Sequence, residues 1–458
     1  MSVNPADSQV FGTLFGTDEM RGIFADRPFV QKMLDVEAAL ARAQARLGII
    51  PQAAADAIAA AASVDRVDLA ELGASTRNVG YPVIGVTKAL GRAAGKDAAG
   101  YVHWGATTQD IMDTAVVLQM RDGLAAIERD IAATARALAE KAQAHRGTVM
   151  AGRTHLQHAL PVTFGFKCAV WLAPLLDHLA RLEELRPRVL TVQFAGAAGT
   201  LASLGDDGRA VTEGLAQELG LAAPVSPWHV NRERIAETGA FLGLVCGSLA
   251  KIATDVILLM QSEIAEVNEP HQAGRGGSST MPQKRNPIAS EYIIAAARGV
   301  HALVPLLFQA MAGDHERATG PWQSEPLALP QIFVLTGGAL AHAAALAQGL
   351  TVDVERMRRN LDATQGLIMA EAYMMRLAEK IGRDTAHHAV QAACGKALAE
   401  KRMLVDVLAE DPAVSKHLDK ATLARLGDPA QYLGEALAVV DRTLALARKR
   451  LGKGEART

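Results

Sequence analysis

The sequence predicts an all-α protein built around long, bundled helices, and three observations lead to that fold class. Apolar residues recur at helical spacing over unusually long stretches, strand-like alternation is almost absent, and helix-breaking segments separate the stretches. Half of the 458 residues are apolar and 21% are charged, which is typical of a globular chain. The length suffices for about three domains.

The first helical stretch begins at Asp26, which can cap a helix whose first turn contains Pro28. Gly48 and Pro51 end this helix. A longer stripe, repeating every three or four residues, runs from Val117 to Ala142 over about seven turns, which is typical of a bundle helix.

A second long pattern extends from about Arg232 to Val267 and is apolar on more than one face, so other helices must surround it. Gly239, Gly243 and Gly247 recur every four residues and permit close helix approach. Further helices are expected at 160–185, 288–312, 327–348 and 366–381.

Two helix-breaking segments suggest where domains meet. The cluster at 101–110 ends an N-terminal helical domain, 1–108, and the stretch from 349 to 362 separates two more. We therefore expect a central bundle domain, 109–355, and a C-terminal helical domain, 356–458.

Charge and composition exclude several function classes. With 47 Lys and Arg against 49 Asp and Glu, the chain gives no electrostatic reason to bind nucleic acid or an anionic membrane. The N-terminus lacks the features of a signal peptide, and no uninterrupted apolar run is long enough to span a membrane. Three widely separated cysteines form no disulfide framework. A soluble, cytoplasmic protein is expected.

The strongest chemical signal is the segment 268–287, NEPHQAGRGGSSTMPQKRNP, between two apolar helices. A glycine-rich loop between rigid helices can open and close, and its N–H groups can line an anion site. A phosphate-binding P-loop fits poorly, because no GK[ST] follows the glycines. On residue types alone, an ordinary surface loop remains an alternative.

Two further polar clusters interrupt the helical pattern, HWGATTQD at 103–110 and GRTHLQH at 152–158. Each places His and Thr close to glycine, outside the apolar stripes, and a capped helix start remains the simpler interpretation. His155 and His158 are three residues apart, but no third metal ligand is evident, so no metal is expected.

These segments resemble the motifs of one enzyme superfamily. GSSTMPQKRNP at 277–287 is similar to the GSSxMPxKxN signature of the fumarase/aspartase superfamily, and the segments 103–114 and 152–165 resemble its two companion motifs in order and spacing. The stretches 20–43, 192–205, 314–325 and 357–372 resemble bacterial 3-carboxy-cis,cis-muconate cycloisomerases, within the adenylosuccinate lyase branch.

The resemblance implies a helical homotetramer whose sites are assembled from three segments of different subunits. It implies a small polycarboxylate substrate, no cofactor, and removal or return of a proton on the carbon next to a carboxylate. Ser278 corresponds to the base, which must act as an alkoxide held by loop N–H groups and by Lys284. His155 corresponds to the general acid of adenylosuccinate lyases, and Glu291 to its carboxylate partner. The implied substrate contacts are Thr107, Thr108, Asn286, Ser279, His103, Gln157, Arg21 and Arg317.

Two departures from the family pattern bear on the substrate. The family's cycloisomerases carry tryptophan at the position of His155, and lactonisation needs no acid for a leaving nitrogen, so His155 favours a C–N lyase. Trp322 and Pro326 replace residues that contact phosphate in adenylosuccinate lyases.

Three functional hypotheses remain. The first is cycloisomerisation of a carboxymuconate-type diene in aromatic catabolism. The second is elimination from, or epimerisation of, an N-substituted aspartate such as an aminodisuccinate, with adenylosuccinate the weaker choice. The third is a non-catalytic structural homologue, which the complete set of candidate catalytic residues disfavours.

Overall fold

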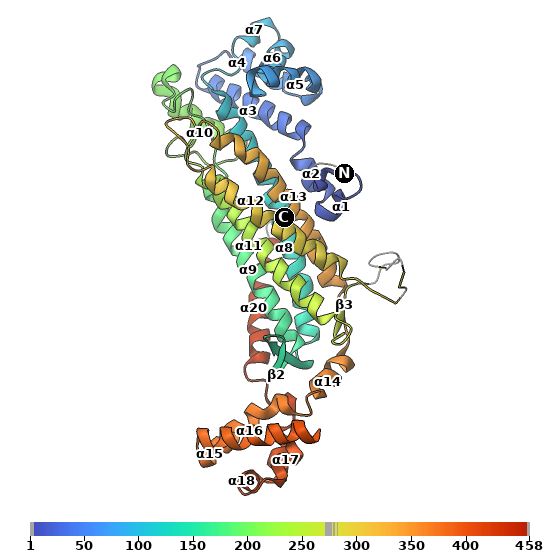
Figure 1. Cartoon of the computed structure of the whole chain (residues 1–458). Coiled ribbons are helices and arrows are strands. Elements are labelled where there is room, and N and C mark those ends of the chain that lie inside the picture. The colour runs from blue at the N-terminus through green and yellow to red at the C-terminus, as the bar shows by residue number, and fades with distance from the viewer. Residues whose placement is uncertain (1–3, 271–276, 278–279, 282, 456–458) are drawn as a thin grey trace. The chain divides into compact units, whose positions relative to one another are not determined.

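The computed structural model describes residues 4–270, 277, 280–281 and 283–455, and this part of the chain is overwhelmingly helical (Figure 1). The fold class expected from the sequence is confirmed. The chain begins with a group of short and medium helices, α1 Gly12–Phe15, α2 Asp18–Ile23, α3 Asp26–Arg46, α4 Gln52–Ala61, α5 Leu69–Val79, α6 Val83–Ala94 and α7 Lys96–Ala99. The central helices are α8 Thr108–Ala144, α9 Phe164–Val189, α10 Gly208–Leu219, α11 Glu233–Leu259, α12 Ile288–Gln309 and α13 Pro321–Gly349.

The remaining helices follow α13 in the sequence. They are α14 Val354–Asp362, α15 Ala370–Ile381, α16 Arg383–Glu400, α17 Leu404–Glu410, α18 Pro412–Ser415, α19 Lys420–Leu426 and α20 Ala436–Glu455. Two small antiparallel pairs of strands complete the described chain: β1 Val149–Thr154 with β2 Gln157–Thr163, and β3 Val267–Asn268 with β4 Thr351–Val352.

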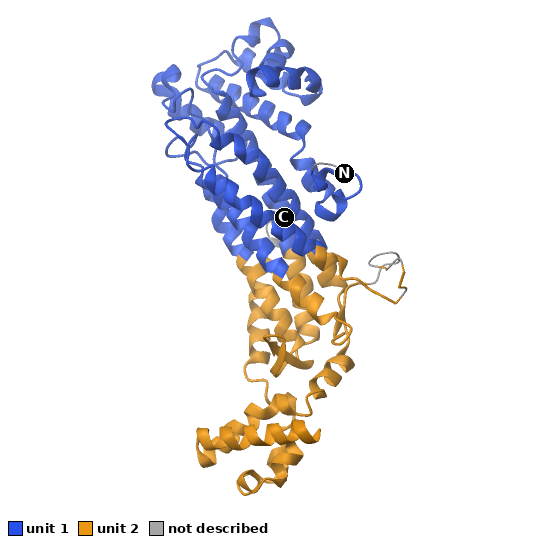
Figure 2. Cartoon of the chain, in the orientation of Figure 1, with its two compact units in different colours: residues 1–131, 178–250, 292–342 blue, residues 132–177, 251–291, 343–458 orange. Residues whose placement is uncertain are grey.

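The chain forms two compact units, each assembled from three separate stretches (Figure 2). Unit 1 contains residues 1–131, 178–250 and 292–342, and unit 2 contains 132–177, 251–291 and 343–458. The long helices contribute residues to both units. The three sequence domains proposed above stay a prediction.

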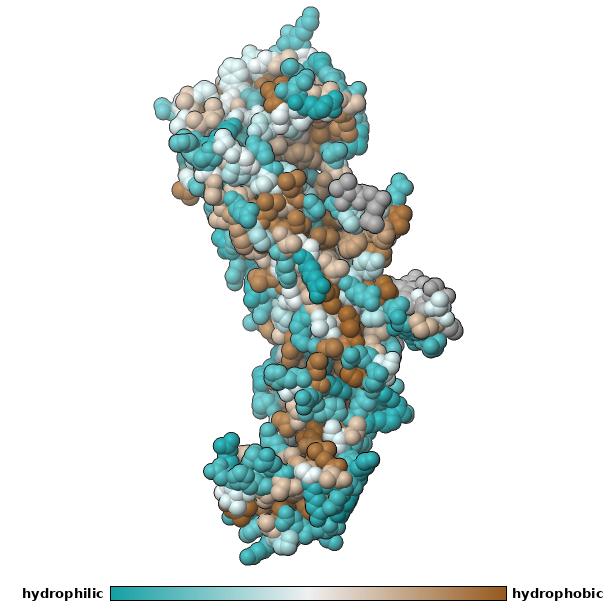
Figure 3. All heavy atoms as spheres, in the orientation of Figure 1, coloured by the Kyte–Doolittle hydropathy of each residue, from teal (hydrophilic) through white to brown (hydrophobic). Residues whose placement is uncertain are grey.

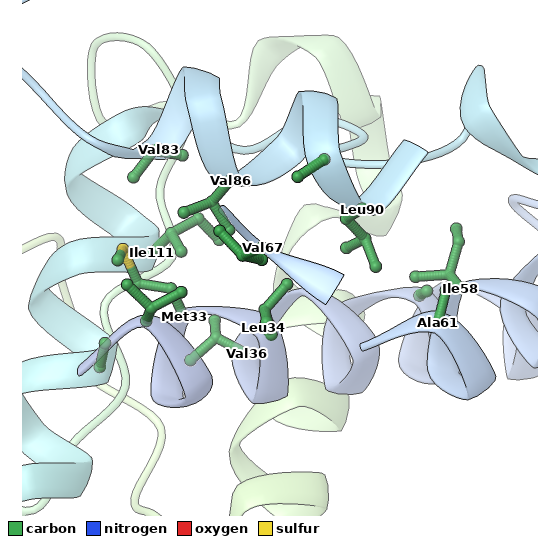
Figure 4. Packing of buried hydrophobic residues seen from close by; sticks show 14 of the residues in the cluster. Met33, Leu34, Val36, Ile58, Ala61, Val67, Val83, Val86, Leu90 and Ile111 are labelled. Carbon is green, nitrogen blue, oxygen red and sulfur yellow. The ribbon is translucent and has the colours of Figure 1, made fainter. Parts of the chain in front are cut away.

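Unit 1 contains a hydrophobic cluster formed by its N-terminal helices. Met33, Leu34 and Val36 of α3 lie among side chains from α4, α6 and the start of α8 (Figure 4). Each of these three residues is at most 1% exposed. The helix begins close to the expected position, with Asp26 as its first residue rather than its cap, and Gly48 follows its end with φ +73°.

The long helices of unit 1 pack against one another, but only one of the three spaced glycines is crowded. A Cβ added at Gly239 of α11 would lie 2.4 Å from the Leu307 side chain of α12, whereas one at Gly243 or Gly247 would lie 3.5 Å or more from its neighbours. Cys246 Sγ of α11 lies 3.4 Å from Thr336 Oγ1 of α13, and Arg186 of α9 pairs with Glu128 of α8 at 2.6 Å.

Two expectations from the sequence are wrong in detail. Helix α11 ends at Leu259 rather than near Val267, because Arg356 and Asn360 donate hydrogen bonds to the carbonyls of 263–264 and draw the chain out of the helix. Residues 149–163 form the β1–β2 hairpin, so helix α9 starts at Phe164 rather than near 160. Gly152 and Pro161 obscure the strand alternation in the sequence.

In unit 2, helices α15 to α19 form their own hydrophobic cluster around Tyr373, Leu377 and Leu404. Three long helices are apolar and long enough to cross a membrane by length and composition alone: Glu233–Leu259, Ile288–Gln309 and Pro321–Gly349. Of the most apolar 18-residue stretch of α12, only 28% is buried within one chain. Figure 3 shows hydrophobic patches over the central helices on the visible face.

Adjacent glycines on α13 test the packing of α13 against the N-terminal segment. A Cβ at Gly338 would lie 2.6–2.8 Å from backbone atoms of Phe15 and Gly16, whereas one at Gly337 would meet only the Met20 side chain, at 3.3 Å or more. We expect Gly338→Ala to destabilise unit 1 by about 1–3 kcal/mol through overpacking, and Gly337→Ala to have little effect. Thermal unfolding measures both, and equal midpoints would contradict the packing described here.

Candidate functional site

The first part of the candidate site surrounds Thr107, directly before α8. Asp110, which is fully buried, accepts hydrogen bonds from the backbone N–H groups of Thr107, Ala195 and Gly196, each at 3.0 Å. His229 Nε2 lies 2.7 Å from the same carboxylate. Four partners satisfy both carboxylate oxygens, so Asp110 fixes the backbone of Thr107 relative to the turn at 195–196.

Arg317 lies beside Thr107 although 210 residues separate them in sequence. Its Nη1 donates to Thr107 Oγ1 at 3.0 Å and its Nη2 donates to the Ala197 carbonyl at 2.9 Å. Its buried Nε has no hydrogen-bond partner. No carboxylate among the described residues forms an ion pair with Arg317, so this part of the chain does not neutralise the partly buried cation. Such a group is suited to bind a carboxylate bidentately.

His103 and Arg21 lie in unit 1 as well, and both have protein partners. His103 Nδ1 lies 2.6 Å from Glu37 Oε1, and its backbone N–H donates to Glu37 Oε2 at 3.1 Å. Burial alone would lower the pKa of His103, but the hydrogen bond and charge of Glu37 raise it above its usual 6.5. Arg21 donates to the Gly12 carbonyl at 2.8 Å and pairs with Asp18. Arg21 therefore holds the N-terminal segment in this chain.

A buried ionic cluster supports the Thr107 region. Arg232, 2% exposed, is held between Asp113 of α8 and Glu325 of α13, with N–O distances of 2.5–3.0 Å. Trp322 Nε1 donates to Asp113 at 3.0 Å, and the Arg232 guanidinium lies 4.8 Å from the centre of the Trp228 ring. Burial raises the pKa of Glu325 although Arg232 opposes the shift. The sequence analysis missed this cluster.

The second part of the candidate site lies in unit 2, at the turn between β1 and β2. His155 and Leu156 form this two-residue turn with φ angles of +50° and +64°, values that non-glycine residues rarely adopt. His155 and Gln157 are exposed, and Leu156 is 74% exposed. Strain at an exposed histidine is typical of a functional turn.

The third part is the end of the segment 268–287 and the start of α12. Gly277 pairs with Arg285 in an isolated antiparallel bridge, and the exposed Lys284 directly precedes it. Asn286 is half-buried, and Glu291 is exposed on the first turn of α12. The candidate base Ser278 and its neighbour Ser279 lie outside the described residues.

The structure thus groups the candidate residues by unit. Thr107, Thr108 and Arg317 lie together in unit 1, with His103 nearby in sequence. His155, Gln157, Lys284, Asn286 and Glu291 belong to unit 2. No hydrogen bond joins His155 to Glu291 in the part of one chain that the structure describes, so their partnership stays a prediction. No group of three His, Cys, Asp or Glu side chains that could hold a metal occurs among the described residues.

Three residues that position the candidates, Arg232, Glu325 and Glu266, had no signal in the motifs, and the sequence indicates Asp110 only as a helix cap. Asp110, Arg232 and Glu325 support the Thr107 region, and Glu266 supports the His155 hairpin by accepting two hydrogen bonds from Arg153, at 2.6 and 2.9 Å. A charged residue inside an otherwise apolar helical pattern, such as Asp113 or Glu325, is the only sequence signal for such burial.

The His103–Glu37 pair predicts a pH-dependent contribution to stability. Because the folded-state pKa of His103 is raised, the contribution is complete below about pH 6.5 and is lost as the pH rises through the folded value. His103→Gln should cost about 1.5–3 kcal/mol at pH 6 and less at pH 9, when measured by thermal unfolding. His387→Gln, at an exposed histidine, is the control. An equal loss at both pH values would refute a charged His103.

Comparisons with known proteins show the family of the chain. A model of the family described as Lyase matches residues 15–301, and a model of the adenylosuccinate lyase C-terminus matches residues 366–443. The chain is 50% identical over 448 residues to 3-carboxy-cis,cis-muconate cycloisomerase from Pseudomonas aeruginosa, covering 97% of each chain.

Two solved structures are similar over nearly the whole chain. One is 3-carboxy-cis,cis-muconate lactonizing enzyme from Pseudomonas putida, with a TM-score of 0.91 and 47% identity, covering 97% of this chain and 100% of that one. The other is fumarate lyase from Mesorhizobium sp. BNC1, with a TM-score of 0.89 and 49% identity, covering 94% and 98%. The chain therefore belongs to the lyase family of the fumarase/aspartase superfamily, as an enzyme of the cycloisomerase-like branch.

Proposed function

We propose that this enzyme catalyses the reversible lactonisation of a 3-carboxy-cis,cis-muconate-type diene. The observation that carries the proposal is the Arg317–Thr107 pair. Arg317 has no carboxylate partner among the described residues, and it lies beside the hydroxyl of Thr107, whose backbone Asp110 fixes. Such a pair suits one carboxylate of a polycarboxylate substrate. The similarity to cycloisomerases at 50% identity supports the choice of substrate class.

The chemistry requires a proton at the carbon next to a carboxylate. In the forward direction a substrate carboxylate oxygen bonds to one alkene carbon, and the neighbouring carbon receives a proton from the residue that acts as the base in the reverse direction. In the reverse direction a base removes that proton and the C–O bond breaks. We assign the base to Ser278 and the nearby positive charge to Lys284, while Asn286 and Arg317 hold the carboxylates whose charge increases in the aci-carboxylate intermediate.

The surroundings of Trp322 argue against a nucleotide substrate. This residue replaces a phosphate contact of adenylosuccinate lyases, and its ring stacks on Tyr81 with 5.5 Å between ring centres. It is 8% exposed and its indole N–H is bound to Asp113. A phosphate placed here would have to displace a packed ring and approach the buried carboxylates of Asp113 and Glu325, so a smaller polycarboxylate is favoured.

One observation favours a second candidate function. His155 is exposed in a strained turn, where an imidazole can protonate a leaving nitrogen. In that case the enzyme is a lyase or epimerase of an N-substituted aspartate, with Glu291 orienting His155. The similarity to a fumarate lyase at 49% identity supports this alternative.

We also propose that four copies assemble in the cytoplasm and share their active sites. Large apolar side chains, including Leu244, Phe308 and Leu327, are 50–60% exposed in one chain, and burial against other copies would remove them from water. Burial of these surfaces between copies would also explain why three described helices are apolar enough to span a membrane, with no need for a membrane. Sedimentation equilibrium should give four times 48.3 kDa, and a monomer would contradict the assembly.

An ultraviolet assay with 3-carboxy-cis,cis-muconate tests the proposed reaction. Lactonisation breaks the conjugated diene, so the absorbance should fall in the presence of enzyme, and Ser278→Ala should slow the fall by about 10²–10⁴-fold. No enzymatic fall from a folded tetramer would exclude the reaction. Substantial activity of Ser278→Ala would remove Ser278 from the role of base.

Replacing His155 separates the two candidate functions. His155→Ala should change the lactonisation rate by less than about threefold, because no leaving nitrogen needs a proton. In a C–N lyase the same change should cost about 10²–10⁴-fold in the release of fumarate from aminodisuccinate. A large loss of lactonisation in His155→Ala would show that this residue acts in the cycloisomerase reaction as well.

A further inference from the structure

A four-residue segment of unit 2, Glu266–Glu269, contacts both elements that carry candidate catalytic residues. The backbone of this segment is held by strand pairing: β3 pairs with β4, with Val267 opposite Val352 and Asn268 opposite Thr351. The Asp353 N–H also donates to the Glu266 carbonyl at 2.9 Å. The two acidic side chains at the ends of the segment therefore project from a fixed backbone.

Glu266 holds the hairpin that carries His155. Its carboxylate, in a fully buried residue, accepts hydrogen bonds from both Arg153 Nη atoms and from Asn360 Nδ2, the last at 2.8 Å. Arg153 is two residues before His155 and pairs with His158 across the hairpin. A bidentate ion pair in a buried setting fixes position as well as charge, so it holds the strained turn in place.

Glu269 holds the start of α12. Its carboxylate accepts hydrogen bonds from the N–H groups of Ala289 and Ser290, at 3.0 and 2.8 Å, and from Ser290 Oγ at 2.7 Å. A carboxylate at a helix N-terminus is favoured by the unpaired N–H groups and by the helix dipole. Ser290 is fully buried and directly precedes Glu291, and Asn286 lies four residues upstream.

We propose that Glu266–Glu269 is a brace that sets the positions of the His155 turn and of residues 286–291 within one subunit. Glu266 and Glu269 are positioning residues: they touch no substrate and act through Arg153 and through the first turn of α12. The inference rests on the proposed function, because it assumes that His155, Asn286 and Glu291 face a substrate in the assembled enzyme. In the cycloisomerase the brace acts through Asn286, and in the lyase alternative it acts through His155 and Glu291 as well.

The first test replaces Glu269 by Gln, which keeps the shape of the side chain but removes its charge and one acceptor. We expect kcat to fall about 10–100-fold with KM changed less than about threefold, because small displacements of catalytic groups are costly. Glu269→Asp, which keeps the charge, should recover part of the loss. Glu263→Gln, at an exposed carboxylate three residues before Glu266, is the matched control and should match the wild type.

The second test does not depend on activity. Lys284 and Arg285 are exposed, and trypsin cleaves after both residues. Loosening the start of α12 should speed this cleavage about fivefold or more in Glu269→Gln, with the tetramer and the thermal midpoint unchanged. Mass spectrometry of the fragments assigns the site of cleavage.

The outcomes separate the two claims. Faster cleavage after Lys284 or Arg285, in an enzyme without activity on any tested polycarboxylate, would support the brace and overturn the proposed function. Wild-type cleavage and wild-type kcat in Glu269→Gln would overturn the brace and leave the proposed function standing. If Glu269→Gln does not fold, Ser290→Ala removes only one of the three hydrogen bonds and should show the same changes at smaller size.

Discussion

One buried guanidinium, Arg232, holds together the helices around the Thr107 region. It is the residue before α11, and its two carboxylate partners belong to α8 and α13, so one cation joins three long helices. Removing Arg232 would leave two buried carboxylates without their counterion, and breaking a buried ion pair in this way typically costs about 3–5 kcal/mol. Asp113 of the cluster and Asp110 are one helical turn apart on α8, so the cluster and the Thr107 contacts share one rigid support.

The buried carboxylates near the candidate residues are satisfied by donors from the protein, whereas Arg317 is not paired with a carboxylate among the described residues. Asp110, Asp113 and Glu266 are at most 2% exposed, and each has several donors from the protein. Arg317, in contrast, has only neutral oxygens as partners among the described residues. A carboxylate bound here would complete its hydrogen bonds and neutralise its charge, and we propose that this interaction serves substrate binding and the charged intermediate.

Periodicity predicted the fold where burial is strongest and failed where tertiary contacts override it. The apolar stripe from Val117 to Ala142 lies within α8, Thr108–Ala144, where other helices surround it. The hairpin at 149–163 was missed because Gly152 and Pro161 obscure its strand alternation. The end of α11 was missed because side chains distant in sequence take up the carbonyls that follow the helix. For the site, motif resemblance named Thr107 and Arg317, but only the structure shows their contact. Arg232 and Glu266 could not be found, because a buried ion pair and a solvated charge look alike in a sequence.

The most direct test of the account is a crystal structure of the enzyme with its lactone product bound. The account predicts a carboxylate of the lactone within hydrogen-bonding distance of Arg317 and Thr107, with Lys284 and Asn286 of another copy at the opposite end of the ligand. A ligand whose carboxylates lie away from Arg317, with its guanidinium still bound only to Thr107 and the 196–197 carbonyls, would contradict the central claim.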